Sequence, residues 1–270
     1  MGGSEVSGSD LRLERDGHIA VATLDRPDKL NALSRELSRE ILDLCEQVNG
    51  DDDIWVLVIT GAGRGFCSGV DLTGQRPAER PEPSHADRVD ELGWVGRQAL
   101  GVSGIAKPTI AAVNGVAAGA GMSLALACDM RTGDSRSRFR TVFAERSLSP
   151  DSGMSYFLPR IVGYSRAADL IFTSRDIGGE EAYRLGLLDR LADGEGALEE
   201  AVRLATVVAS LPPIAIRSGK RVLQHNMTVG LEEALRYETA GLNYARKAPN
   251  DSAESMLSFR ERRAPRFTGT

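Results

Sequence analysis

The chain has 270 residues, of which 41% are hydrophobic and 26% charged, a composition typical of a folded domain with a substantial core. Its formal net charge of −5 gives no reason to expect a nucleic-acid or membrane partner. The cysteines Cys45, Cys67 and Cys128 lie far apart, which favours a reducing, cytoplasmic location over a disulfide framework or a zinc site. Residues 1–10 are mostly small and polar, so we expect a disordered leader rather than a secretory signal.

Strand and helix patterns alternate in the first half of the chain. Apolar residues alternate over Ile19–Thr23, and a compact apolar run covers Ile54–Ile59, so both are predicted strands. Between them, Ser34 is a predicted N-cap, and the apolar residues of Leu37–Val48 recur with the spacing of one helix face. Thr109–Val113 is a third predicted strand. This order predicts an α/β fold with parallel strand pairing.

The pattern changes after residue 196, where amphipathic helices replace strands. The predicted helices are Leu198–Ser210, Ile214–Asn226, Leu231–Ala248 and Ser252–Arg262. We therefore expect an α/β core over residues 11–196 and a helical segment over residues 197–270. The Pro-rich stretch Thr73–Asp90 has little periodicity and is expected to form an exposed loop.

Two glycine-rich elements each follow a predicted strand. The first, Gly61–Leu72, reads GAGRGFCSGVDL, and the second, Asn114–Asp129, opens a predicted helix over Gly119–Ala127. Glycines allow backbone N–H groups to approach a ligand, and a helix start favours developing negative charge. Neither element matches a phosphate loop or a dinucleotide fingerprint. Each alone is equally explained by a tight turn or by close packing, and the two together are far more specific.

The order of motifs around these elements resembles the crotonase (enoyl-CoA hydratase/isomerase) superfamily. RPDKLNAL (Arg26–Leu33) precedes them, and PDSGMSYFLPRIVG (Pro150–Gly163), EEAYRLGLLD (Glu180–Asp189) and the closing FRERRAPRF follow. The resemblance implies a spiral of ββα units followed by helices that build a homotrimer or a dimer of trimers. It also implies an acyl-CoA thioester substrate, with CoA as part of that substrate and without a metal or another cofactor.

The resemblance further implies that two backbone N–H groups stabilise a thioester enolate. By motif position these donors are Ser68 and Ala120, and each is expected to contribute about 3 kcal/mol to the transition state. Ala120 stands where the family often has glycine. The residues implied to contact CoA or the acyl group are Lys29, Leu30, Phe66, Gly69, Asp71, Gly119 and Phe143, with Phe259 and Arg262 supplied by a neighbouring subunit.

The acid/base residues, rather than the oxyanion hole, decide the reaction. Hydratases of the family use two glutamates, and this chain has Ser123 and Phe143 at those places. Asp151 resembles the single base of some 3,2-enoyl-CoA isomerases and ring-opening isomerases. We therefore predict a one-base isomerase in which Asp151 lies partly buried in an acyl pocket. A capping or turn role for Asp151 is the alternative.

Other functions remain open. A hydratase or lyase with non-standard acid/base residues is one, for which Glu145 and His85 are candidates. A non-catalytic acyl-CoA binder is a second. An RNA contact through Arg260–Arg266 is a third, although a solvated tail explains that stretch more simply, so nucleic acid is not an expected partner. Cys67 and Ser68 have no evident base partner, which argues against a covalent acyl-enzyme.

Overall fold

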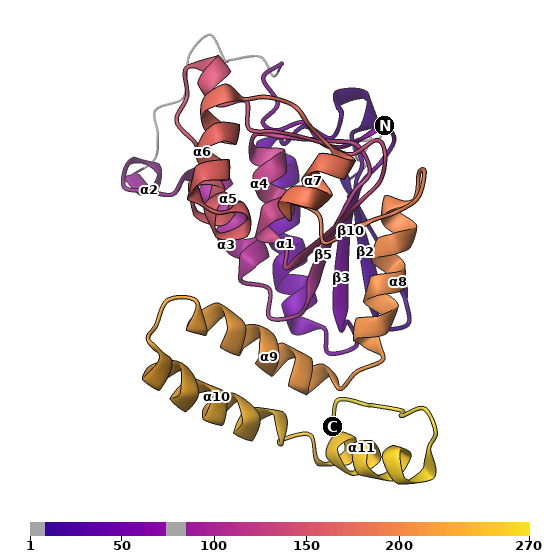
Figure 1. The fold of residues 1–270 in the computed structure, drawn as a ribbon. Helices are drawn as coiled ribbons and strands as arrows, with labels where there is room; N and C mark the ends of the chain where they lie inside the picture. Colours follow the sequence, from indigo (N-terminus) through magenta and orange to yellow (C-terminus); the bar gives the residue numbers. More distant parts are fainter. Residues whose placement is uncertain (1–8, 74–84) are drawn as a thin grey trace, which may run out of the picture.

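The computed structural model describes residues 9–73 and 85–270 of the chain (Figure 1). Most of the expected leader therefore lies outside the described residues, but Ser9 is included and its Oγ donates a hydrogen bond to Glu40 Oε2 at 3.0 Å. The expected loop over Thr73–Asp90 also falls largely outside them. In its described part, His85–Arg88 forms the short helix α2.

The main sheet has six strands in the order β1-β2-β3-β5-β7-β10. Only the β1–β2 pair is antiparallel, and all other neighbours are parallel. The expected parallel α/β pairing is therefore confirmed. The strands are β1 Leu11–Asp16, β2 Ile19–Leu24, β3 Val56–Gly61, β5 Thr109–Val113, β7 Met130–Gly133 and β10 Arg190–Leu191.

A second, smaller sheet runs beside the first in the order β4-β6-β8-β9. Its strands are β4 Gly65–Cys67, β6 Val116–Ala118, β8 Arg138–Arg140 and β9 Ile177–Gly178. The strands come in consecutive pairs, in which the first strand joins the main sheet, the second joins the smaller sheet, and a helix follows. The pair β3–β4 is followed by α3 (Gly93–Ser103), β5–β6 by α4 (Ala120–Ala127), and β7–β8 by α5 (Met154–Val162). This repetition is the expected spiral of ββα units.

Side-chain alternation along β3 decides which helices cover the main sheet. Leu57 and Ile59 belong to the cluster that includes α1, whereas Val56 and Val58 face α8. Helix α1 (Arg35–Gly50) begins as predicted, because the Leu37 N–H donates to Ser34 Oγ at 3.0 Å. The remaining short elements are η1 Pro27–Lys29, η2 Ala144–Arg146, α6 Tyr164–Thr173 and α7 Gly179–Leu185.

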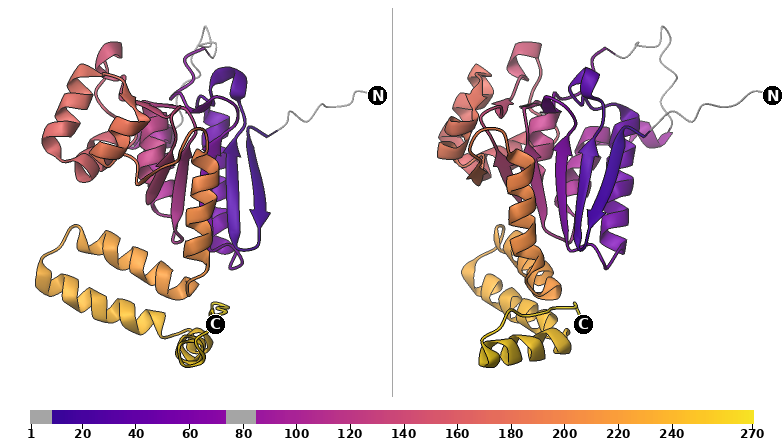
Figure 2. Two further views of the ribbon diagram at one scale, coloured as in Figure 1. Left: turned by 45° about the vertical axis from the view of Figure 1, so that its right-hand side comes forward. Right: turned by 90° about the vertical axis from the view of Figure 1, so that its right-hand side faces the viewer.

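Helix α8 (Ala197–Ala209) belongs to the core rather than to the terminal helices. Its residues Ala201, Leu204 and Ala205 are buried against the main sheet, and the helix runs along the strands (Figure 2). The boundary expected between residues 196 and 197 is therefore wrong. The amphipathic pattern was correct, but it could not distinguish packing on a sheet from packing on other helices.

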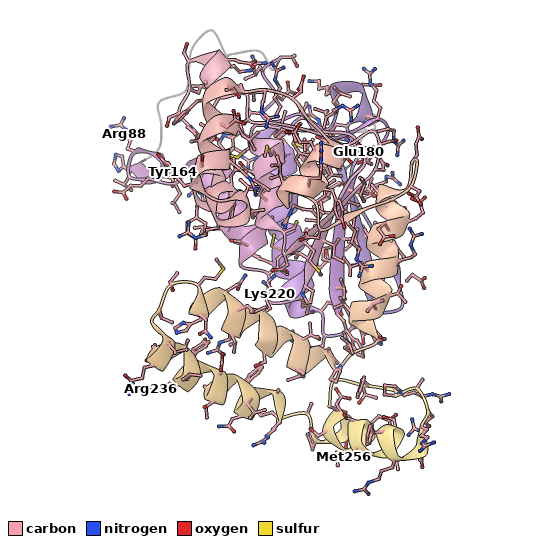
Figure 3. The ribbon with its side chains drawn as sticks, viewed as in Figure 1. Arg88, Tyr164, Glu180, Lys220, Arg236 and Met256 are labelled. Carbon is pink, nitrogen blue, oxygen red and sulfur yellow. The ribbon has the colours of Figure 1, made fainter. Side chains whose placement is uncertain are left out.

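The last three helices lie beyond the core. They are α9 (Pro213–Asn226), α10 (Leu231–Ala245) and α11 (Pro249–Glu261), and α9 packs along α10 (Figure 2). Lys220 lies on the side of α9 that faces the core, and Arg236 lies on the outer side of α10 (Figure 3). Within the described ranges, no single helix is long and apolar enough to cross a membrane; α8 and α9 meet that criterion only together, across a bend of 107°.

Candidate active site

A cleft of about 510 Å³ opens where the two glycine-rich elements meet. One wall comes from η1 and the turn after β4, and includes Lys29, Gly69 and Asp71. β6 with the start of α4 lines the cleft next, and the chain between β8 and α5 forms the other wall, because β6 lies between β4 and β8 in the second sheet. The cleft therefore brings together segments that lie more than one hundred residues apart in the sequence.

The turn after β4 presents a different backbone donor from the one expected. The Ser68 N–H donates to the Leu30 carbonyl at 3.0 Å, so it is engaged within the fold and does not face the cleft. Gly69 then adopts a φ of 98°, which is the left-handed region, and the Asp71 N–H turns back to the Leu33 carbonyl. Between them, the Val70 N–H makes no hydrogen bond with any described residue. The assignment of Ser68 as a donor is therefore wrong, and Val70 supplies the free N–H.

The start of α4 supplies a second set of free N–H groups. Ala120 is the first residue of the helix, lines the cleft, and its N–H has no hydrogen-bond partner among the described residues. A Cβ added to Gly69 would lie 3.7 Å from the Ala120 nitrogen, so the β4 turn and the helix start are close together. A Cβ on Gly121 would lie 2.1 Å from the Cys67 carbonyl oxygen, which explains why glycine is needed there.

An ion cluster holds the β4 turn in place. Asp71 Oδ2 lies 2.9 Å from both Arg26 Nη2 and Lys29 Nζ, and its other oxygen accepts hydrogen bonds from the Thr73 hydroxyl and N–H at 2.6 and 2.9 Å. These bonds, led by that of the Thr73 hydroxyl and then that of Lys29, hold the pKa of Asp71 well below its usual range. Asp71 and Lys29 both line the cleft, but the oxygens of Asp71 are already occupied by this cluster.

The two positions that carry glutamates in hydratases hold no carboxylate in this cleft. Ser123 lies in the first turn of α4 and is 1% exposed, and its hydroxyl has no hydrogen-bond partner. Phe143 is 5% exposed, and it lines the cleft next to Val142, whose φ of 56° is unusual for a β-branched residue. An aromatic ring therefore occupies the wall where a second carboxylate would be needed.

Asp151 lines the same cleft and has no cation within ion-pair distance among the described residues. Its Oδ1 accepts a hydrogen bond from the Ser152 hydroxyl at 2.6 Å. A capping role for Asp151 finds no support, because the N-cap of α5 is Gly153, without a side-chain cap; a turn role does, because the Asp151 carbonyl accepts the Met154 N–H at 2.9 Å. The side chain is exposed in the single chain, so the expected partial burial is not found.

The remaining acid/base candidates are either paired or distant. Glu145 Oε1 lies 2.6 Å from Arg140 Nη2, and the Arg140 Nε lies 3.7 Å from Asp176 and donates to the Ser174 carbonyl. Glu145 does not line the cleft, and neither does His85 on α2. Burial raises the pKa of the Cys67 thiol to about 12, so Cys67 is not a nucleophile at neutral pH.

The residues expected to contact CoA divide into three groups. Lys29, Gly69, Asp71, Gly119 and Phe143 line the cleft. Phe66 is fully buried in the core and Leu30 does not line the cleft, so these two positions support the turn instead. Phe259 and Arg262 lie at the end of α11 and outside the cleft of the single chain. Their proposed contact with a neighbouring subunit stays a prediction.

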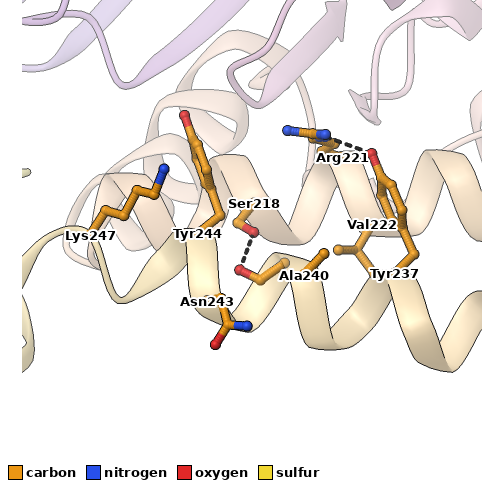
Figure 4. A pocket seen from close by; sticks show the side chains of 9 residues that line it. Ser218, Arg221, Val222, Tyr237, Ala240, Asn243, Tyr244 and Lys247 are labelled. Carbon is orange, nitrogen blue, oxygen red and sulfur yellow. Dashed lines mark hydrogen bonds between the residues drawn. The ribbon is translucent and has the colours of Figure 1, made fainter.

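A second hollow of about 350 Å³ lies between α9 and α10 (Figure 4). Tyr237 and Tyr244 line it, together with Arg221 and Lys247, and the Arg221 Nε donates to the Tyr237 hydroxyl at 2.6 Å. It contains no carboxylate and no free backbone donor pair. In the described part of the chain, no group of three or more His, Cys, Asp or Glu residues is placed to hold a metal ion.

Comparison with known proteins agrees with this geometry. Residues 14–270 match the family model "Enoyl-CoA hydratase/isomerase". Human enoyl-CoA hydratase domain-containing protein 2, mitochondrial, is 34% identical over 99% of this chain and 91% of its own length. The 1,2-epoxyphenylacetyl-CoA isomerase of Escherichia coli is 33% identical, over 93% of this chain and 95% of its own. A crystal structure of an enoyl-CoA hydratase from Bacillus anthracis superposes with a TM-score of 0.89 at 29% identity, covering 97% of this chain and 100% of the other. The chain belongs to the enoyl-CoA hydratase/isomerase family and is an enzyme of the crotonase superfamily.

Proposed function

We propose that the enzyme shifts a carbon–carbon double bond in an enoyl-CoA thioester with Asp151 as its only acid/base residue. The observation that carries the proposal is the composition of the cleft wall. Ser123 and Phe143 stand at the two glutamate positions of hydratases, and Phe143 lines the cleft, whereas Asp151 lines it with a carboxylate that has no cation partner among the described residues. The Escherichia coli relative named as an isomerase is further support.

The reaction would begin when Asp151 removes a proton from C2 of a 3-enoyl-CoA. The negative charge that develops on the thioester oxygen is stabilised by the N–H groups of Val70 and Ala120, because neither bonds to a described residue and both residues line the cleft. The protonated Asp151 then returns the proton to C4 of the dienolate. The double bond moves from C3–C4 to C2–C3, and the carboxylate is regenerated without a second base.

We propose that CoA enters at the Lys29 end of the cleft and that the acyl group extends from the donors toward Phe143 and Asp151. We also propose a homotrimer, or a dimer of trimers, that works in the cytoplasm and uses no metal or redox cofactor. The apolar side chains of Leu223, Leu231 and Leu235, exposed on α9 and α10, support assembly through these helices.

Hydration of a 2-enoyl-CoA is the second candidate function. Several relatives carry the name enoyl-CoA hydratase, among them the short-chain enzyme of Clostridium acetobutylicum at 29% identity. A hydratase needs groups that activate water and protonate C2, and Glu145 is held by Arg140 outside the cleft. This contact makes hydration the weaker candidate.

The deciding experiment supplies trans-3-enoyl-CoA and trans-2-enoyl-CoA esters of several chain lengths to the purified protein, with product identification by mass spectrometry. Isomerisation leaves the mass unchanged and produces the conjugated thioester, whereas hydration adds the mass of one water. We expect isomerised product from the 3-enoyl esters and little hydrated product from either set. Rapid hydration with no isomerisation would reject the proposal in favour of the second candidate.

A further inference from the structure

Two of the three basic residues that the structure describes in the cleft are paired with carboxylates of the same chain. Lys29 is paired with Asp71, and Arg140 is paired with Glu145 and Asp176. Each of these two cations therefore already faces at least one carboxylate. The third basic residue among the described residues that line the cleft is Arg146, at the end of η2.

Arg146 differs from Arg140 although the two residues stand in the same wall. Its side chain is exposed, and its guanidinium has neither an ion pair nor a hydrogen bond with any described residue. Its backbone is fixed, because the Arg146 N–H donates to the Phe143 carbonyl at 3.0 Å. The Arg146 charge is therefore carried by the cleft wall, and no described residue neutralises it.

The position of Arg146 along the cleft indicates which part of a ligand it meets. In the second sheet β6 lies between β4 and β8, and the three strands are parallel, so Ala120 after β6 lies between the β4 turn, where Lys29 pairs with Asp71, and the chain after β8, which carries Arg146. If the thioester carbonyl lies at the two N–H donors and CoA lies at the Lys29 end, the acyl group extends along Phe143, Arg146 and Leu148. This step rests on the proposed function.

We infer that Arg146 is a specificity-determining residue that binds a carboxylate at the far end of the acyl group. A guanidinium offers a fork of donors that matches a carboxylate, and charge-assisted hydrogen bonds of this kind are stronger than neutral ones. The preferred substrates are then CoA esters of unsaturated dicarboxylic acids rather than of simple fatty acids. Phe143 and Leu148 contact the apolar carbons between the two ends.

The test measures binding by titration calorimetry with saturated CoA esters in length-matched pairs. Each pair differs only in its terminal group: succinyl- and butyryl-CoA, adipyl- and hexanoyl-CoA, suberyl- and octanoyl-CoA. We expect the carboxylate-ended ester of at least one pair to bind about tenfold more tightly, and less so at high salt. Arg146→Leu should abolish this preference and leave the binding of the methyl-ended ester within about twofold of the original, whereas Arg146→Lys should retain part of the preference.

Arg166→Leu is the matched control, because Arg166 is an exposed arginine on the neighbouring helix α6 and lies outside the cleft. No preference in any pair, or a preference that survives Arg146→Leu, would overturn the inference. An equal loss of affinity for all esters and for free CoA would instead assign Arg146 to the CoA phosphates and would also overturn it. Because the readout is binding of inert esters, it stands apart from the isomerisation assay, and either one can fail without the other.

Discussion

At the residue scale, Gly69 decides which backbone donor faces the cleft. Its φ of 98° interrupts the regular alternation of N–H directions, so the N–H groups of Ser68 and Asp71 both point to the segment Leu30–Leu33. Val70 is left with an N–H that the fold does not use. A side chain at residue 69 would be strained at this φ, and its Cβ would lie 2.8 Å from the Ala118 carbonyl oxygen.

Ala120 offers a direct test of the second donor. It is the first residue of α4, where proline is well tolerated and removes only the N–H. We expect Ala120→Pro to lower kcat by about two to three orders of magnitude, equivalent to about 3 kcal/mol, because one oxyanion donor is lost. Ala120→Gly keeps the N–H and should retain most of the activity. Equal kcat values for the two variants, both folded by circular dichroism, would contradict this role.

The sequence predicted part of the site and missed part of it for a definable reason. The motif order pointed to Ala120, Gly69 and Asp151, and all three line one cleft in the structure. It could not reveal that Gly69 reverses the N–H direction, because φ is not visible in a motif. Nor could it show that Phe66, which belongs to the same motif, is fully buried. Val70 could have been found only by accounting for every N–H of the turn.

At the scale of elements, the ion cluster of Arg26, Lys29 and Asp71 fixes the β4 turn against η1. Because the pKa of Asp71 is lowered in the folded state, its contribution to stability is present above the unfolded value of ~3.9 and is lost as the pH falls below it. We expect Asp71→Asn to lower the free energy of unfolding at pH 7, and this difference from the original protein to shrink as the pH falls below about 4.

Urea unfolding at a series of pH values measures this effect. Glu232→Gln is the matched control, since Glu232 is 82% exposed and forms only a surface ion pair with Arg236 on α10. It should change stability by less than about 1 kcal/mol at any pH. If Asp71→Asn lowered the free energy of unfolding by the same amount at every pH, the stability of the ion cluster would not depend on the carboxylate charge.

A second element-scale contact joins α9 to the core. Lys220 Nζ lies 2.6 Å from Asp129 Oδ2 and donates to the Lys107 carbonyl at 2.9 Å, and its side chain is 8% exposed. Asp129 also accepts the Thr109 N–H at 2.8 Å. We expect Lys220→Met to lower the free energy of unfolding by about 3 kcal/mol, because the substitution leaves the Asp129 carboxylate and the Lys107 carbonyl without their cation.

Hydrogen exchange followed by mass spectrometry locates the effect of this substitution. Exchange should increase mainly in α9 and α10, since Lys220 is their buried ionic link to the sheet. Lys247→Met is the control, because Lys247 stands in the turn after α10, lines the hollow between α9 and α10, and has no ion pair among the described residues. Unchanged exchange in α9 after Lys220→Met would contradict the proposed anchoring role.

At the scale of the whole molecule, the helices beyond the core expose apolar surface that a lone chain does not cover. Leu223 and Leu231 are 71% and 77% exposed, and Phe259 is 83% exposed. We expect sedimentation equilibrium to give three or six times the 29.0 kDa of one chain. Replacing Leu231 and Leu235 with Asp should dissociate the assembly, whereas an Arg236→Asp control on the outer side of α10 should not. A monomer at micromolar concentration would contradict this expectation.

The overall architecture was more accessible to sequence reasoning than its boundaries. The order of strand and helix patterns, with a capped helix between Ile19–Thr23 and Ile54–Ile59, predicted the parallel pairing. The position of α8 was not predictable, since its apolar stripe of Ala201, Leu204 and Ala205 would suit a sheet or a helix partner equally well. Tertiary packing decided between the two.

The central claim, a single acid/base residue, is tested most directly by Asp151→Asn. Turnover of trans-3-enoyl-CoA and binding of a saturated acyl-CoA should be measured on the same preparations of both proteins. We expect turnover to fall by at least about two orders of magnitude while the dissociation constant changes little, because the substitution removes the proton carrier and leaves the N–H donors of Val70 and Ala120 in place. Undiminished isomerisation by the Asp151→Asn protein would contradict this claim and would assign the proton transfer to another group.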